Sequence, residues 1–270
     1  MRKLLNVLYV TSPDAYLTKD GENVVIKVQD ETKFRIPIHN LEGIVCLSYV
    51  GASPALMGFC AERNVALSFI TETGKFLARV TGPVSGNVLL RRTQYRFADD
   101  LEQAKKLAYS FILGKIANCR TVIQRSLRDH AQLPGAPLNE AVQALADCIK
   151  RLEKASSLDH VRGIEGEAAR AYFSVFDYLI VAQKEDFKFN GRNRRPPLDK
   201  MNALLSFLYT LLRLDVQAAL ETVGLDPAVG FLHRDRPGRP GLALDLMEEL
   251  RPVMADRLAL SLVNRKQISS

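Results

Sequence analysis

Residues 226–252 read DPAVGFLHRDRPGRPGLALDLMEELRP, and two features of this stretch organise the rest of the chain. The first is an apolar run that ends at His233, followed by a loop rich in arginine, proline and glycine. The second is a helix-like run in which leucines surround three acids, Asp245, Glu248 and Glu249. Histidine and carboxylates are thus brought close together by a short, turn-rich segment.

The spacing of the acids has an electrostatic consequence. Residues three and four apart share one side of a helix, so Asp245 and at least one of the two glutamates lie together. Like charges at that spacing repel each other unless a cation lies between them. A divalent metal or the arginines of the preceding loop would supply that cation. An ordinary amphipathic helix with a hydrated acidic face is the other interpretation.

A further acid lies in a second predicted helix. Residues 161–183, VRGIEGEAARAYFSVFDYLIVAQ, are mostly small or apolar and predict a largely buried helix. Glu165 is costly there unless it is paired or bound to metal, and Arg162 or Arg170 could serve as its partner. Gly166 costs about 1 kcal/mol relative to alanine inside a helix, which indicates a close approach by a bulky group or another backbone. Glutamate, histidine and a second acid on separate segments can form a mixed oxygen and nitrogen site for Mn²⁺ or Mg²⁺.

Three motifs carry a resemblance over nearly the whole chain. They are IEG-x-AAR-x-YF from residue 164, FN-GRNRRPPLDKMNALLSFLY from residue 189, and GFLH-x(5)-R-x(2)-LALDLMEELRP from residue 230. In this order they resemble the CRISPR-associated integrase and endonuclease of the adaptation module, the first of the Cas proteins. Their detail is similar to the branch of that family found in type I-C systems.

The resemblance implies an α+β fold with two domains. Residues 1–85 would form an N-terminal β-rich domain for dimerisation, and residues 86–270 a larger all-α catalytic domain that carries the metal site. Family members usually continue for several dozen residues more, so the second domain is expected to be truncated at its C-terminus. Transferred onto this sequence, the catalytic metal ligands are Glu165, His233 and Glu248, with Asp245 as a further candidate ligand. Glu249 falls on a different part of the helix.

The activity implied is that of a metal-dependent DNA endonuclease and integrase. It would insert short foreign DNA fragments as new spacers into a CRISPR array, by transesterification from a DNA 3′-hydroxyl. A DNA-binding scaffold without catalysis, and a metal-dependent nuclease without integration, are the alternatives. The implied partners are double-stranded DNA (prespacer and leader–repeat), a second copy of the chain, the small ferredoxin-like second CRISPR-associated protein and a prespacer-trimming nuclease. The expected location is the prokaryotic cytoplasm, with no membrane partner.

Basic residues identify the expected DNA contacts. Residues 183–200 combine cations with Phe187 and Phe189, which suits phosphates and stacked bases, although a flexible hydrated loop is the alternative. Asn202 matches a family position that helps to organise the site. The arginines after His233 are placed to hold the scissile phosphate. The residues predicted to bind DNA are Arg192, Arg194, Arg195, Asn202, Arg234, Arg236 and Arg239.

Composition agrees with this interpretation. A net charge of +7 favours an acidic partner, and no apolar run reaches the ~18–20 residues of a membrane helix. The four cysteines form no CxxC pair and are typical of core residues in a reducing compartment.

Two periodicities divide the chain. Residues 1–85 predict strands at 4–10, 23–28, 33–38, 43–47, 65–70 and 75–80, a hairpin turn at Asp20-Gly21 and a short helix capped by Ser53. From residue 88 the pattern is helical. Most of the basic residues in 88–128, a set that contains Lys115, are expected on a hydrated helix face, while some of them, Arg91 and Arg92 especially, could lie along a DNA track.

Overall fold

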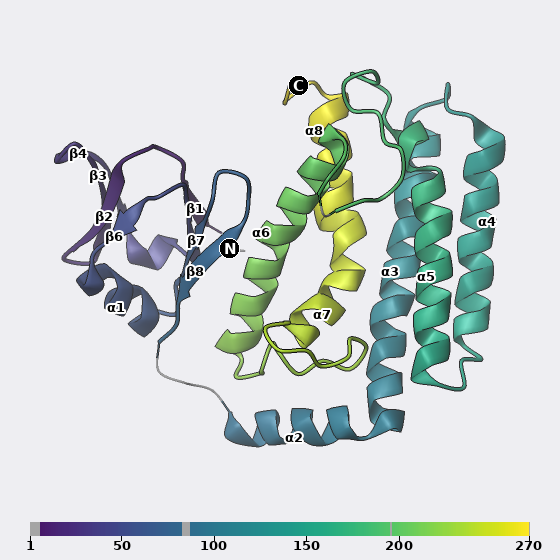
Figure 1. The fold of residues 1–270 in the computed structure, drawn as a ribbon, viewed down its shortest axis with the longest axis horizontal. Coiled ribbons are helices and arrows are strands. Elements are labelled where there is room, and N and C mark those ends of the chain that lie inside the picture. Colours follow the sequence, from purple (N-terminus) through teal and green to yellow (C-terminus); the bar gives the residue numbers. More distant parts are fainter. Residues whose placement is uncertain (1–5, 83–86, 195, 270) are drawn as a thin grey trace. The chain divides into compact units, whose positions relative to one another are not determined.

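The structure is a computed structural model that describes residues 6–82, 87–194 and 196–269. The chain divides into two compact units, one of residues 1–86 with 221–224 and one of residues 87–220 with 225–270 (Figure 1). The first unit contains the strands and the second contains the long helices. The α+β fold expected from the sequence is therefore confirmed.

The first unit contains two four-stranded sheets. One sheet has the order β1 (Val7–Val10), β5 (Gly43–Leu47), β7 (Ala66–Ile70) and β8 (Phe76–Val80). The other has the order β4 (Glu31–Pro37), β3 (Asn23–Val28), β2 (Ala15–Asp20) and β6 (Gly51–Ala52). A short 3-10 helix, η1 (Ile38–Asn40), follows β4. The sequence pattern indicated six of these strands, whereas it gave no sign of β2 and β6.

Local signals at the predicted turns act as expected. Strands β2 and β3 pair in antiparallel register with Asp20 opposite Asn23, and Gly21 takes the positive φ of 57° that the tight turn between them needs. Helix α1 (Pro54–Glu62) begins after Ser53, whose hydroxyl accepts a hydrogen bond from the Leu56 amide at 3.2 Å.

The regular structure described in the second unit is helical. Its elements are α2 (Val88–Asp99), α3 (Leu101–Asp129), α4 (Gly135–Leu152), α5 (Leu158–Ser174), η2 (Phe176–Leu179), α6 (Lys200–Thr222), α7 (Gly241–Arg251), η3 (Pro252–Asp256) and α8 (Arg257–Asn264). The long α3 lies beside α4 and α5 and also contacts α7 (Figure 1). It therefore touches both of the helices that carry the predicted metal-binding glutamates.

The buried helix predicted over residues 161–183 is shorter than expected. Helix α5 ends at Ser174 and the chain continues as the 3-10 turn η2. Aromatic packing accounts for this change of direction, because the rings of Phe173, Phe176 and Phe189 lie within 6 Å of one another. In addition, the Asp177 carboxylate accepts a hydrogen bond from the Phe189 amide at 2.8 Å, which holds the following loop against the turn.

Among the described residues, α6 is the one helix that is long and apolar enough to cross a membrane by length and composition. It contributes buried residues to the protein core instead: Leu205 and Leu208 belong to one hydrophobic cluster, and Leu212 and Val216 belong to another. All four cysteines are buried and free, as the sequence predicted.

Candidate metal and nucleic-acid site

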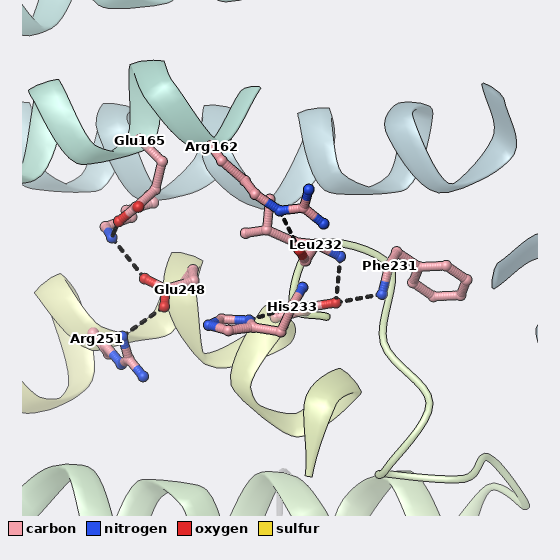
Figure 2. A network of polar contacts seen from close by, with 9 residues as sticks. Arg162, Glu165, Phe231, Leu232, His233, Glu248 and Arg251 are labelled. Atoms are coloured by element: carbon pink, nitrogen blue, oxygen red, sulfur yellow. Dashed lines mark hydrogen bonds and ion pairs between the residues drawn. The ribbon is translucent and has the colours of Figure 1, made fainter. Parts of the chain in front are cut away.

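Asp245 organises the loop that carries His233. Its side chain has no solvent exposure. One carboxylate oxygen accepts the amides of Phe231 at 2.6 Å and Leu232 at 2.9 Å. The other oxygen accepts the amide of His233 at 3.0 Å and lies 2.6 Å from Nδ1 of the same histidine (Figure 2). The acid therefore fixes both the backbone and the ring of His233.

Two glycines allow this arrangement. A Cβ atom on Gly230 would lie 2.7 Å from Oδ2 of Asp245 and 2.7 Å from the carbonyl carbon of Gly241. A Cβ atom on Gly241 would lie 2.6 Å from the backbone oxygen of Ala228. The loop and the first turn of α7 thus pack backbone against backbone, which only residues without a side chain permit.

The hydrogen bond to Asp245 orients the imidazole of His233. A carboxylate beside Nδ1 favours the tautomer that carries its proton there, which leaves Nε2 with a lone pair for another partner. In Figure 2 the ring extends toward Glu248. Arg162 supports the same loop by donating a hydrogen bond from Nε to the Leu232 carbonyl oxygen at 2.8 Å.

Glu165 and Glu248 are brought together by a buried lysine. The ammonium group of Lys115, on α3, forms ion pairs with Oε1 of Glu165 on α5 and, at 2.7 Å, with Oε2 of Glu248 on α7. Figure 2 shows the two glutamates facing each other across this contact. The acids predicted as metal ligands do meet, with a lysine between them.

Lys115 differs from the hydrated helix face that was expected for most basic residues of this region. Lys115 is only 8% exposed and lies on the same stripe of α3 as the buried residues Ile112, Ile116 and Cys119. Its position three residues after Ile112 and four before Cys119 placed it on the apolar side, so the sequence did contain a signal. The ion-pair partner of Glu165 is Lys115 and neither of the arginines considered, Arg162 and Arg170.

Glu248 is the more deeply buried of the two acids, at 4% exposure. Its Oε1 accepts a hydrogen bond from Arg251 at 2.6 Å. Burial by itself raises the pKa of Glu248, but the charges of Arg251 and Lys115 outweigh it and lower the pKa to about 2. Burial likewise lowers the pKa of Lys115, but Glu248 and Glu165 raise it above 10.5 overall. Both groups are charged at neutral pH.

Glu165, His233 and Glu248 are suitable metal ligands by chemical type, but they are spaced too widely here to bind one metal ion together. In residues 6–82, 87–194 and 196–269, no three His, Cys, Asp or Glu side chains are grouped closely enough to bind a metal ion. Two carboxylates and an imidazole are nevertheless a donor set that Mn²⁺ and Mg²⁺ accept. The position between Glu165 and Glu248 already binds one cation, the lysine ammonium. The residues therefore fit the metal in charge and type, provided that Lys115 moves.

Asn202 and Arg192 stabilise the basic loop from within. Asn202 has no solvent exposure; its Nδ2 donates to the Gly191 carbonyl at 2.8 Å and its Oδ1 accepts from Arg192 at 2.7 Å. The guanidinium of Arg192 lies over the ring of Tyr209 at 5.2 Å, and that of Arg251 lies over the same ring at 5.1 Å. Tyr209 thus links the loop to the arginine that pairs with Glu248.

The aromatic residues of the loop do not face solvent as their expected role requires. Phe187 is 3% exposed and Phe189 is 4% exposed, and Phe189 stacks on Phe173. The expectation that these rings stack on bases is wrong for this conformation, because the same apolar surface fills the core.

The close approach expected at Gly166 is not observed, since a Cβ atom there would meet nothing within 4 Å. The close approach occurs instead at Gly114, whose added Cβ would lie 2.9 Å from Cβ of Glu249.

The other predicted DNA-binding residues lie at the surface. Arg194, Arg234 and Arg236 are exposed and Arg239 is partly exposed. Arg234 makes a 3.2 Å ion pair with Asp159. Arg195 lies outside the described residues. A cavity of about 460 Å³ opens beside this surface, and its lining includes His233, Arg234 and Arg162.

Known proteins match this chain over nearly its whole length. The family model described as CRISPR associated protein Cas1 matches residues 8–270. The CRISPR-associated endonuclease Cas1 1 of Chlorobaculum tepidum is 55% identical over 269 residues, which are 99% of this chain and 78% of that protein. The CRISPR-associated endonuclease Cas1 2 of Rhodospirillum rubrum is 53% identical, with the same two shares. A Cas4/Cas1 fusion of Geobacter sulfurreducens, named exonuclease and endonuclease, is 36% identical over 97% of this chain and 47% of its own length.

Solved structures agree with these relatives. A Cas1 protein from Thermotoga maritima has a TM-score of 0.84 and 25% identity, over 98% of this chain and 81% of that one. A chain of a Cas6-RT-Cas1–Cas2 complex has a TM-score of 0.81 and 25% identity, over 100% of this chain and 29% of that one. With the family model matched over residues 8–270 and relatives above 50% identity, the chain belongs to the Cas1 family of CRISPR-associated proteins.

Proposed function

We propose that this chain is the metal-dependent DNA endonuclease and integrase of a CRISPR adaptation module, with Glu165, His233 and Glu248 as the ligands of Mn²⁺ or Mg²⁺. The observation that carries the proposal is that Glu165 on α5 and Glu248 on α7 meet at one lysine ammonium, while the ring of His233 extends toward Glu248. The relatives named endonucleases support the reaction class. The finer assignment to a type I-C system, and a cytoplasmic location, are part of the same proposal.

A divalent metal bound here supplies a Lewis acid that polarises a phosphodiester and lowers the pKa of an attacking hydroxyl. The residues of the chain do the positioning. Asp245 holds the proton on Nδ1 of His233 and so keeps Nε2 ready as a ligand. We assign Asp245 the role of orienting His233 and not that of a direct metal ligand. Both of its carboxylate oxygens already accept hydrogen bonds from the backbone and from the imidazole ring.

Exposed arginines provide the proposed DNA contacts. Arg234, Arg236 and Arg239 follow His233 directly and can bind the phosphates on either side of the reacting one. Arg194 is an exposed member of the basic loop. Arg192 and Asn202 are assigned to holding the loop in shape, since their polar atoms are engaged within the protein. Residue 195 belongs to the same basic run in sequence.

In the proposed reaction, the oxygen of a DNA 3′-hydroxyl forms a bond to the phosphorus of a second DNA strand as the bond from that phosphorus to the leaving 3′-oxygen breaks. The leaving oxygen takes up a proton. One phosphodiester replaces another, so no nucleotide cofactor is required. Attack by water at the same site would give hydrolysis, which is the nuclease alternative. A scaffold that binds DNA without either reaction is the remaining candidate.

Partners are proposed from the relatives. A Cas6-RT-Cas1–Cas2 complex among the solved structures supports a Cas2-type partner. The Cas4/Cas1 fusion supports a helper exonuclease that trims the DNA before integration. The β-rich domain of residues 1–85 is proposed as the dimerisation surface, and residues 86–270 as the catalytic domain.

The test is a strand-transfer assay. Labelled duplexes with free 3′-ends are incubated with supercoiled plasmid carrying a leader–repeat, in Mn²⁺, Mg²⁺ or EDTA, with and without the Cas2-type partner. We expect label to join the plasmid, and this joining to be lost in EDTA and in Glu165→Ala and His233→Ala. Glu167→Ala is the matched control, because Glu167 lies on α5 as well but pairs with Arg151 at the surface. Nicking without joining would favour the nuclease, and DNA binding without either reaction would favour the scaffold.

A further inference from the structure

The position of Lys115 bears directly on metal binding at this site. Its ammonium touches two carboxylates from two different helices, Glu165 on α5 and Glu248 on α7. Both acids lie on helices that contact α3, on which Lys115 is buried. The ammonium thus spans the gap between the acids that the proposed function assigns to one metal ion.

The charges in this cluster balance without any metal. Glu165 and Glu248 contribute two negative charges, and Lys115 and Arg251 contribute two positive charges. A divalent cation placed between the two acids would therefore meet an ammonium and a guanidinium that are already paired with them. Repulsion between cations in a poorly hydrated site is strong. Lys115 must withdraw from at least one carboxylate before a metal ion can bind both.

Arg251 cannot yield in the same way. It bonds to the other oxygen of Glu248, Oε1, and its guanidinium is held over the Tyr209 ring. Lys115 has a single flexible stem and a compact charge that can rotate away. Of the two cations, the lysine is the one that lies on the oxygen facing Glu165.

We propose that Lys115 is a positioning residue of the metal site: it holds Glu165 and Glu248 together in the metal-free protein and competes directly with the metal for them. This inference rests on the proposed function, because it takes Glu165 and Glu248 as metal ligands. The Lys115 ammonium would act as a counter-cation: it keeps the two acids together when no metal is bound, and it reduces their affinity for metal.

The test compares Lys115→Met with the unmodified chain in thermal unfolding and in Mn²⁺ titration by calorimetry. In EDTA we expect Lys115→Met to unfold at a lower temperature, because two buried acids lose their shared cation. Mn²⁺ should raise the unfolding temperature of Lys115→Met by more than that of the unmodified chain. The variant should also bind Mn²⁺ about tenfold more tightly or better, since the competing cation is gone.

Three further proteins control the comparison. Lys105→Met removes a lysine from the same helix whose partner is the exposed Glu102, and should match the unmodified chain in both measurements. Glu248→Gln should lose the response to Mn²⁺. The double variant Lys115→Met/Glu165→Gln removes one acid together with the cation. It should recover stability in EDTA, which distinguishes charge imbalance from a general failure to fold.

The outcomes separate the inference from the proposed function. Equal Mn²⁺ affinity and equal thermal shift in Lys115→Met and the unmodified chain, both abolished by Glu248→Gln, overturn the inference and leave the metal site standing. Absence of Mn²⁺ binding in both proteins overturns the metal site and the inference together. Failure of the double variant to recover stability in EDTA also contradicts the role of Lys115 as counter-cation.

Discussion

Nδ1 of His233 lies 2.6 Å from Oδ1 of Asp245, a carboxylate with no solvent exposure that also accepts three backbone amides. In each of these contacts a nitrogen of residues 231–233 donates a hydrogen bond to the Asp245 carboxylate. The relationship makes Asp245 the structural support of the histidine that the proposed function uses as a metal ligand.

Asp245→Asn should therefore impair both folding and catalysis. The substituted amide presents an N–H₂ group to donors, so at least one of the four contacts becomes repulsive. We expect the free energy of unfolding to fall by about 1–3 kcal/mol. Metal affinity or strand transfer should fall about 10–100-fold, as when the supporting partner of a metal-bound histidine is removed. Denaturant unfolding and Mn²⁺ titration measure these effects, and unchanged values in both would contradict the assigned role.

Gly230→Ala should destabilise the loop before α7. The added Cβ would lie 2.7 Å from Oδ2 of Asp245 and 2.7 Å from the backbone of Gly241, which cannot give way as a flexible side chain can. We expect a lower unfolding temperature and weaker Mn²⁺ binding. Gly166→Ala is the matched control, because that Cβ meets nothing within 4 Å on a helix. The control should stabilise the protein by about 1 kcal/mol. The interpretation fails if the two variants behave alike.

Asp256 should make stability depend on pH in the direction opposite to most acids. It is 2% exposed and accepts a hydrogen bond from the Tyr209 hydroxyl at 2.6 Å. Burial raises the pKa of Asp256 from 3.8 to about 6, although Tyr209, Arg251 and Arg192 act to lower it. Between these two values the folded protein binds more protons at Asp256 than the unfolded chain does. Its contribution therefore destabilises the fold as pH rises from about 4 to about 6.

Asp256→Asn isolates this effect. The stability of the unmodified chain relative to the variant should decrease by about 2 kcal/mol between pH 4 and pH 7, most of it below pH 6. Urea unfolding of both proteins at several pH values measures the difference. A difference that does not vary with pH would show that Asp256 titrates normally.

Arg192 and Arg194 should separate structural from DNA-binding roles within one loop. Arg194→Ala should leave the unfolding free energy within about 0.5 kcal/mol of its original value, because the side chain is exposed. It should weaken binding to duplex DNA and reduce the salt dependence of that binding by about one ion.

Arg192→Ala should act first on stability. The guanidinium donates to Asn202 at 2.7 Å and to Ser206 at 3.3 Å and packs over Tyr209. Its removal leaves the Asn193 amide, at 3.1 Å, as the remaining donor to Oδ1 of the buried Asn202. We expect a loss of about 1–3 kcal/mol. If Arg192→Ala weakens DNA binding with no loss of stability, Arg192 is a direct DNA contact and the structural assignment is incorrect.

The sequence by itself determined the local structure: helix caps, turns, and where several strands and helices begin. The Ser53 cap, the turn at Gly21, six strands and the start of the long helices follow from residue type and spacing over a few positions. The order of the three motifs also indicated the Cas1 family, which the comparisons confirm. Such features depend on neighbours within one or two turns of chain, and sequence patterns record those neighbours directly.

Tertiary structure decided which groups face one another. Lys115 lies 50 residues from Glu165 in sequence, and no local spacing pairs them. Phe189 fills the core beside Phe173 because a loop folds back on α5, although its cationic neighbours suggested a surface role. Asp245 serves the backbone of residues 231–233 because two glycines let the loop approach α7. These contacts join residues 12 to 50 positions apart on different segments, beyond the range of local sequence patterns, so tertiary packing determines which residues meet.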